Sequence, residues 1–183
     1  RSSIMRGGLL LLIRSSATTR TRPAQPGPDG PLLTPGQAIA SPHTRLQYRI
    51  DRLIGRGGFG QVYLARRVGY SATIPSTICI KVSPHIDGWL REAYFGQILD
   101  AHPRAIRVYD TFPLLRPAGP VLYCLALEYA RHGDLRTYLR RNPAGWSEVA
   151  ARREIAGILP VLGKLHRGQM LHRDLTPLNV FVC

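Results

Sequence analysis

Lysine is almost absent from this 183-residue chain, although the chain is strongly basic, with a formal net charge of +14. Only Lys81 and Lys164 are lysines among the 25 basic residues. Arginine presents a wide planar fork, whereas lysine is a compact point charge on a flexible stem. Because Lys81 lies in an apolar, strand-like stretch, it is a candidate functional residue. Alternatively, lysine stands at position 81 by chance and has no special role.

Cysteine and long apolar runs are scarce as well. Cys79, Cys124 and Cys183 are far apart and odd in number, which excludes a disulfide framework and a zinc site. We therefore expect a reducing, cytoplasmic compartment. The N-terminal run Leu9–Ile13 has only five apolar residues, and a membrane helix needs about 20. No membrane segment is predicted in this stretch, and an anchor beyond residue 183 stays open.

The excess of arginine does not form a nucleic-acid-binding pattern. The arginines are spread along the chain, without a basic run of five to eight residues and without interleaved aromatic residues that could stack on bases. An anionic ligand is the simpler explanation of the charge, and no specific nucleic-acid partner is expected. Charge-driven binding to nucleic acid remains an alternative.

The chain divides into three parts by its pattern. Residues 1–44 are rich in Pro, Gly and Arg and predict a disordered tail. Apolar alternation and helical spacing then predict a β-β-β-α-β-β order followed by helices. Asp87 is the expected N-cap of the first helix, and Pro160 is expected to kink the last one. The expected strands are 48–55, 60–67, 76–83, 105–112 and 121–129, and the expected helices are 87–99, 133–141 and about 147–167.

A glycine cluster connects the first two predicted strands. Gly55, Gly57 and Gly60 form the pattern G-x-G-x-x-G, in which the backbone can approach phosphate oxygens without a Cβ in the way. A dinucleotide-binding turn would lead from a strand into a helix, so the strand-to-strand context excludes it. By itself the pattern also fits a hairpin turn without a ligand.

Two further pairs of residues carry chemistry. Lys81 on the third strand and Glu92 on the next helix would satisfy each other as a buried ion pair that reaches toward phosphates. The alternative is a solvent-facing glutamate and an edge lysine.

Near the end of the chain, Asp174 and Asn179 lie five residues apart in a loop. A carboxylate can accept a hydroxyl proton, and an amide oxygen can bind a hard cation such as Mg²⁺.

Taken together, the glycine loop, Lys81, Glu92 and the sequence HRDLTPLN resemble a eukaryotic-type protein kinase catalytic domain over residues 46–183. The resemblance implies an α+β fold: a five-stranded antiparallel N-lobe with one helix over residues 45–129, and the hinge and part of a helical C-lobe over residues 130–183. It also implies an ATP-dependent protein kinase that uses Mg²⁺ and transfers the γ-phosphate to a Ser or Thr hydroxyl of a protein.

The resemblance also implies a role for each matching residue. Asp174 would be the catalytic base, Lys81 would bind the α- and β-phosphates and pair with Glu92, and Asn179 would ligate Mg²⁺. Leu127 would close the back of the adenine pocket, Glu128 and Ala130 would bind the base through their backbones, and Phe181 would lie beneath it. The implied ATP-site residues are Ile54, Gly55, Gly57, Gly58, Phe59, Gly60, Val62, Cys79, Lys81, Leu127, Glu128, Ala130 and Phe181.

Three departures from the family pattern bear on activity. Cys79 replaces the usual Ala as a slightly larger roof for adenine, and Thr176 replaces the Lys that is usual in Ser/Thr-directed kinases. Pro177 nevertheless favours the Ser/Thr pattern, and Arg173 is typical of kinases regulated by a phosphorylated activation loop. The given sequence ends at Cys183, before the position at which the family pattern leads us to expect the D-F-G segment. We therefore expect near-zero phosphotransfer and uncovered apolar helix faces in residues 1–183 alone.

Other functions remain open at this point. A pseudokinase or nucleotide-binding scaffold would share the fold without the transfer reaction. A small-molecule kinase of the aminoglycoside type shares an H-x-D-x-x-x-x-N loop, although the complete glycine loop and HRDL favour a protein kinase. The presence of Lys81, Glu92, Asp174 and Asn179 together favours an active parent enzyme over a pseudokinase.

Overall fold

The computed structural model describes residues 8–12, 30–58, 60–100 and 102–183. The chain forms two compact units. The first, here called the sheet unit, comprises residues 17–94 and 108–129, and the second, the helical unit, comprises residues 1–16, 95–107 and 130–183. The division places a boundary between Tyr129 and Ala130, where the sequence predicts the hinge.

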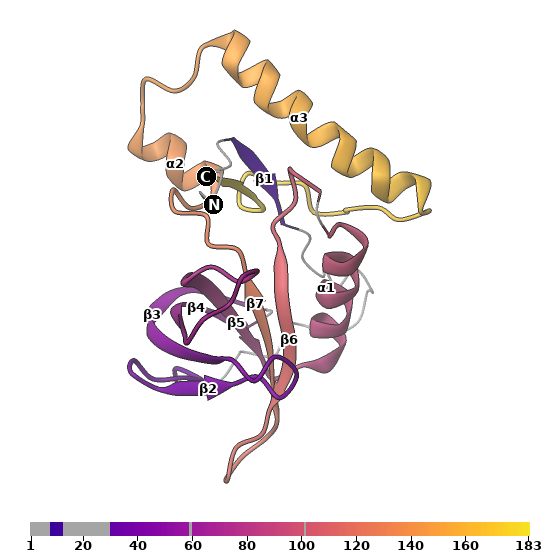
Figure 1. The fold of residues 1–183 in the computed structure, drawn as a ribbon. Helices are drawn as coiled ribbons and strands as arrows, with labels where there is room; N and C mark the ends of the chain where they lie inside the picture. Colours follow the sequence, from indigo (N-terminus) through magenta and orange to yellow (C-terminus); the bar gives the residue numbers. More distant parts are fainter. Residues whose placement is uncertain (1–7, 13–29, 59, 101) are drawn as a thin grey trace. The chain divides into compact units, whose positions relative to one another are not determined.

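The sheet unit contains an antiparallel six-stranded sheet with the order β2-β3-β4-β5-β7-β6 (Figure 1). The predicted order of strands and helix is confirmed, with α1 between β5 and β6. The sixth strand, β2, comes from the segment expected to be disordered. The strand bounds are β2 Ala38–Ala40, β3 Gln47–Gly57, β4 Gly60–Val68, β5 Thr77–Ser83, β6 Val108–Leu114 and β7 Leu122–Leu127, and α1 spans Ile86–Ile98.

Alternation along β5 decides which side chains enter the core of this unit. Ile78, Ile80 and Val82 are fully buried and lie on one face, because successive side chains in a strand point to opposite faces. Cys79 and Lys81 therefore belong to the opposite face. The core on the first face consists mainly of Leu33, Ile39, Tyr48, Ile50, Tyr63, Ala65, Ile74, Ile78, Ile80, Val82, Phe112, Leu122, Cys124 and Ala126.

The expectation of a disordered tail over residues 1–44 does not hold for its described parts. Ile39 in β2 is buried against the sheet core, and β2 pairs with β3. The Leu33 backbone N–H donates to the Tyr63 hydroxyl at 3.0 Å, and the Gln61 amide donates to the Gly30 carbonyl at 2.8 Å. These partners are distant in sequence, which is why composition alone did not reveal them. The rest of the predicted tail, residues 1–7 and 13–29, lies outside the described residues.

The helical unit contains α2 (Leu135–Arg141), α3 (Glu148–Arg167) and a two-stranded antiparallel sheet of β1 (Leu9–Leu11) and β8 (Val180–Val182). Both helices begin at side-chain caps: Asp134 accepts from the Thr137 N–H and Ser147 from the Ala150 N–H. The buried apolar core of this unit consists of Leu9, Leu11, Leu99, Ala105, Ile158, Val161, Leu165, Val180 and Val182.

Several details differ from the sequence-based expectations. α1 begins at Ile86, so Asp87 lies in its first turn and is not its N-cap. Pro160 lies inside α3, which continues to Arg167, and the expected kink at this residue stays a prediction. β6 begins at Val108 and not at residue 105, because Ala105 instead forms a bridge with Leu11 of the helical unit. None of the helices in the described ranges is long and apolar enough to cross a membrane.

α3 carries exposed apolar side chains, in line with the expectation of uncovered apolar surface over residues 147–167. Val149 is 79% exposed, and Ile155 and Leu159 are each 58% exposed. Ile155 and Leu159, four residues apart, are neighbours on the helix surface, whereas Val149 lies apart from them.

The β3–β4 hairpin generates a prediction on stability. Gly60 has a φ of +119°, and a Cβ at this position would lie 2.1 Å from the Val82 carbonyl oxygen. We expect Gly60→Ala to lower the free energy of unfolding by at least about 2 kcal/mol, because an L side chain is strained there and meets rigid backbone. Urea unfolding followed by circular dichroism measures the change.

Gly57→Ala is the matched control in the same hairpin. A Cβ at Gly57 would meet no atom within 4 Å, so the expected change is within about 0.5 kcal/mol. Equal losses for the two variants would show that the close approach at Gly60 is not a constraint on the fold.

Candidate active site

The glycine cluster forms the tip of the β3–β4 hairpin. Gly57 pairs with Gly60, and Gly55 pairs with Val62. Gly57 and Gly58 are exposed with open space around Gly57, so their backbones are accessible to a ligand. Gly60 has a second reason to be glycine, because its positive φ and its contact with Val82 exclude a side chain. Phe59 lies outside the described residues.

Strand register aligns the predicted adenine and phosphate residues on one face of the sheet. Val62 on β4 pairs with Lys81 on β5, and Lys81 pairs with Leu125 on β7. Cys79 pairs with Leu127 one step further along. Paired residues in neighbouring strands share a face, and this is the face opposite the hydrophobic core. Ile54, also predicted for this site, is 38% exposed on β3.

Lys81 and Glu92 form the buried ion pair that the sequence predicts. The Lys81 Nζ lies 2.5 Å from Glu92 Oε1 and 2.6 Å from Oε2. Their side chains are only 8% and 4% exposed. The helix that carries Glu92 is tied to the sheet by Trp89, whose indole N–H donates to the Cys124 carbonyl at 2.9 Å. A charge pair this deep is stable only with good geometry, which the bidentate contact provides.

Cys79 is a neutral apolar neighbour of Lys81. Burial raises the pKa of its thiol to about 12, so the thiol stays protonated and unreactive at neutral pH. The Cys79 side chain therefore offers a neutral, apolar surface on this face. Such a surface suits packing against a flat aromatic ligand. Cys124 on β7 is likewise buried, and its thiol pKa is raised to about 12 by burial and by the nearby Asp110.

The segment after β7 leads from one unit to the other. Leu127 is buried at the end of β7, Glu128 is partly buried and Ala130 is buried. The Ala130 carbonyl accepts from the Gly133 N–H at 3.1 Å, which closes a turn. Residues 132–133 then pair with β8: the His132 N–H donates to the Val182 carbonyl at 3.2 Å, and the Val182 N–H donates to the Gly133 carbonyl at 2.9 Å.

The loop between α3 and β8 brings Asp174 and Asn179 into contact. The Asn179 Nδ2 donates to the Asp174 Oδ2 at 2.7 Å and to the Asp174 carbonyl at 2.8 Å. The Asp174 N–H lies 3.3 Å from His172 Nδ1, which accepts it. Arg173 between them adopts a left-handed φ of +60° and is exposed. The loop from His172 to Asn179 is therefore held closed by hydrogen bonds of its own side chains.

Asn179 has the free acceptor that a metal ligand needs. Both Nδ2 bonds fix the orientation of its amide, and Oδ1 is buried without a hydrogen-bond partner among the described residues. A buried acceptor without a partner costs free energy, and a hard cation such as Mg²⁺ prefers such an amide oxygen. Asn179 thus fits the role of a magnesium ligand.

The predicted site residues are divided between the two units. The sheet unit carries Lys81, Glu92 and the glycine loop, whereas the helical unit carries Asp174 and Asn179. Ala130 and Phe181 also belong to the helical unit, where Phe181 on β8 bridges to Asp134. The structure brings Lys81 together with Glu92, and Asp174 together with Asn179. The joint action of the two groups stays a prediction.

Sequence reasoning missed the N-terminal partner of the loop between α3 and β8. The Leu12 N–H donates to the Asn179 carbonyl at 2.9 Å, and His172 Nε2 lies 3.1 Å from the Leu12 carbonyl. The one available signal was the apolar run Leu9–Ile13 in an otherwise polar segment. Nothing in that run indicates which strand it would join.

The Lys81–Glu92 pair yields a prediction that requires no ligand. We expect Glu92→Ala to lower the free energy of unfolding by about 3–5 kcal/mol, because the buried Lys81 ammonium loses its counter-charge. Glu148→Ala is the matched control, since it breaks an exposed pair with Arg152 that is worth at most about 0.5 kcal/mol. Urea titration of both variants checks the difference, and similar values would refute a buried pair.

Comparisons with known proteins agree with this geometry. A family model described as a protein kinase domain matches residues 48–183. Serine/threonine-protein kinase C of Synechocystis sp. is 29% identical over 146 residues, which are 74% of this chain and 26% of that protein. The SNF-related serine/threonine-protein kinase of Homo sapiens is 30% identical over 135 residues, 73% of this chain and 17% of that protein.

A third relative, serine/threonine-protein kinase pkn3 of Myxococcus xanthus, is 30% identical over 146 residues, 74% of this chain and 24% of that protein. The chain therefore spans about a quarter or less of the length of these curated relatives. The match to the family covers the glycine hairpin, the buried Lys81–Glu92 pair and the loop of Asp174 and Asn179 alike. On these grounds, this chain belongs to the protein kinase family.

Proposed function

We propose that this chain provides the nucleotide-binding and catalytic-loop residues of a protein kinase that transfers the ATP γ-phosphate to a Ser or Thr hydroxyl of a protein. The observation that carries the proposal is the contact between Asp174 and Asn179, in which the buried Asn179 Oδ1 has no hydrogen-bond partner among the described residues. The Ser/Thr specificity in the names of the relatives supports the choice of acceptor. Pro177 in the loop supports it as well, while Thr176 departs from the usual Lys.

Residues of the sheet unit, together with Ala130 of the helical unit, would bind the nucleotide. The face that carries Val62, Cys79 and Leu127 is apolar and lies opposite the core, which suits a flat base. The backbones of Glu128 and Ala130 would hydrogen-bond the base edge. Lys81, on the same face, would hold the α- and β-phosphates while the contact with Glu92 directs its ammonium group. Gly57 and Gly58 would cover the phosphates through their exposed backbones.

The helical unit would act on the reacting oxygen. Asp174 would accept the proton of the substrate hydroxyl as that oxygen attacks the γ-phosphorus, the bond from this phosphorus to the bridging β–γ oxygen breaks, and ADP leaves. Asn179 holds the Asp174 carboxylate through Nδ2 at 2.7 Å, so the base is positioned before substrate binds. When bound, Mg²⁺ would neutralise phosphate charge, with Asn179 Oδ1 as one of its ligands.

Two finer points follow from the same residues. Arg173 is exposed beside Asp174, and its guanidinium could pair with a phosphate that fixes a regulatory loop. Cys79 and Cys124 are buried and form no disulfide among the described residues; a reducing compartment such as the cytoplasm stays part of the proposal.

Binding of ATP tests the proposal directly. We expect Lys81→Met to weaken the binding of Mg-ATP to residues 1–183 at least about tenfold, because a charge-assisted contact to phosphate is lost. Isothermal titration calorimetry measures the dissociation constant, and circular dichroism verifies that the variant is folded. Lys164→Met is the matched control, since it removes the other lysine, in the last turn of α3.

The proposal fails if the unaltered chain does not bind millimolar Mg-ATP, or if Lys81→Met and Lys164→Met bind it equally well. Binding to DNA that falls steeply with salt and survives Lys81→Met would instead favour a charge-driven nucleic-acid binder.

A further inference from the structure

Residues 30–33, here called the 30–33 segment, lie against β4, the strand that leaves the glycine hairpin. Leu33 is 1% exposed and belongs to the core of the sheet unit, and Leu32 packs against that core. The segment precedes residues 48–183, which match the protein kinase family. Its contacts with β4 are therefore a feature of this chain that the family match does not cover.

Gln61 is the residue of β4 that binds this segment. Its Nε2 donates to the Gly30 carbonyl at 2.8 Å, and its Oε1 accepts from the Leu32 N–H at 2.8 Å. The Tyr63 hydroxyl donates to the same Oε1 and accepts from the Leu33 N–H at 3.0 Å. Gln61 is 5% exposed. A buried side-chain amide needs partners for its donor and its acceptor, and here the segment supplies both.

Gln61 lies at the base of the glycine hairpin. It directly follows Gly60, and it is the last residue of β4 on the hairpin side that pairs with β5, where its partner is Val82. Beyond it, the register pairs Gly60 with Gly57 of β3. The glycines of the hairpin therefore lie past the last pair between β4 and β5, and Gln61 marks the point from which they extend.

The contact with the segment is on the face of the sheet opposite the proposed nucleotide site. Successive side chains of a strand point to opposite faces. Val62 belongs to the proposed nucleotide face, so Gln61 and Tyr63 belong to the core face, where both are buried. Bonds on the core face restrain the base of the hairpin and leave the exposed backbones of Gly57 and Gly58 accessible to phosphates.

Release of the segment would leave polar groups without partners on both sides of the contact. On β4 these are the amide of Gln61 and the hydroxyl of Tyr63, and on the segment they are one backbone carbonyl and two backbone N–H groups. A buried polar group that loses its hydrogen bond is costly. Leu33 would also leave the core. The segment is therefore a firmly bound support and not a loose covering.

We propose that the 30–33 segment restrains the glycine hairpin through Gln61, which makes Gln61 a positioning residue for nucleotide phosphates. The inference rests on the proposed function, because it concerns the hairpin assigned to phosphate binding. A hairpin that is ordered before the nucleotide arrives loses less conformational freedom on binding. The segment then raises the affinity for the phosphates without contacting them.

Gln61→Leu tests the contact without any ligand. Leucine suits the apolar core but cannot bond to Gly30 or Leu32. We expect exchange of the Leu32 amide to become at least about tenfold faster. The Ile50 amide, which donates to the Gln37 carbonyl at 2.8 Å, is the internal control and should stay within about twofold. Circular dichroism verifies folding, and Gln61→Met serves in the same way if the leucine variant is unfolded.

Backbone dynamics test the restraint itself. We expect the NMR order parameters of the Gly57 and Gly58 amides to fall by at least about 0.1 in Gln61→Leu, because rigid and flexible backbones differ by about 0.25 or more. Ile39→Ala is the matched control, since Ile39 lies in the same core at 3% exposure. Its truncation destabilises the sheet unit and leaves the Gln61 bonds in place, so the two order parameters should not change.

A comparison of Mg-ATP with adenosine separates positioning from general stability. Adenosine offers the base without phosphates, so its binding does not depend on the glycine hairpin. We expect Gln61→Leu to weaken binding of Mg-ATP to residues 1–183 at least about threefold, and binding of adenosine less than about 1.5-fold. Isothermal titration calorimetry measures both, and Ile39→Ala should change neither.

Each contrary result overturns the inference in a specific way. Unchanged exchange of the Leu32 amide would show that Gln61 does not hold the segment. Faster exchange with unchanged order parameters of Gly57 and Gly58 would show that the segment does not restrain the hairpin. Equal weakening of Mg-ATP and adenosine would show that Gln61 supports only the sheet. If the unaltered chain bound neither ligand, the proposed function would fail, and the order parameters would still decide whether the segment restrains the hairpin.

Discussion

The burial of one ammonium group constrains the whole sheet unit. Lys81 is inside the protein, so its charge requires a carboxylate at bonding distance, and Glu92 supplies one at 2.5 and 2.6 Å. That contact specifies where α1 must lie against β5. It also requires β5 to present Lys81 on the face opposite Ile80 and Val82, because a shift of one residue would exchange the two faces. The position of the core, the position of α1 and the proposed phosphate site therefore all depend on the register of β5.

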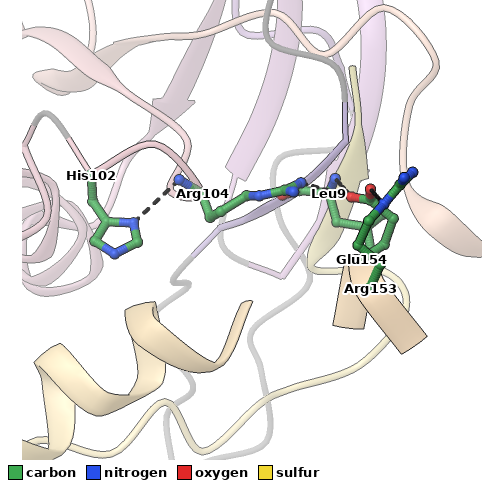
Figure 2. A network of polar contacts seen from close by, with 5 residues as sticks. All are labelled: Leu9, His102, Arg104, Arg153 and Glu154. Carbon is green, nitrogen blue, oxygen red and sulfur yellow. Dashed lines mark hydrogen bonds and ion pairs between the residues drawn. The ribbon is translucent and has the colours of Figure 1, made fainter. Parts of the chain in front are cut away.

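The helical unit depends on a different kind of constraint. The loop between α3 and β8 is closed locally by the Asp174–Asn179 contact, and β8 after this loop has bonded neighbours on both edges. Residues 132–133 provide one of them and the N-terminal strand provides the other. The same unit buries Glu154 next to Arg104 (Figure 2), where hydrogen bonds from Arg104 and from the Leu9 N–H lower the carboxyl pKa against the raising effect of burial. Backbone and side-chain bonding thus hold the N-terminal segment together.

Much of the fold and of the candidate site could be predicted. The strand order, α1, α2 and α3 followed from apolar periodicity, and Lys81, Glu92, Asp174 and Asn179 followed from motif spacing. The errors concern segments whose structure depends on distant partners. β2 docks through Ile39 on the sheet, and β1 docks between β8 and residues 104–106. Short strands carry little periodicity, and the polar composition around them favoured disorder.

By itself the sequence determined the chemistry: which residue types recur at which spacing, and therefore the family and the candidate base, metal ligand and phosphate-binding lysine. Local pattern suffices for this because spacing along a strand or loop fixes which side chains share a face. The tertiary structure alone decided that Gly60 must avoid the Val82 carbonyl, that Asn179 keeps a buried oxygen without a partner in the described part of the chain, and that Leu12 bonds to the loop. These are contacts between segments far apart in the chain, and only the folded backbone brings their atoms within bonding distance.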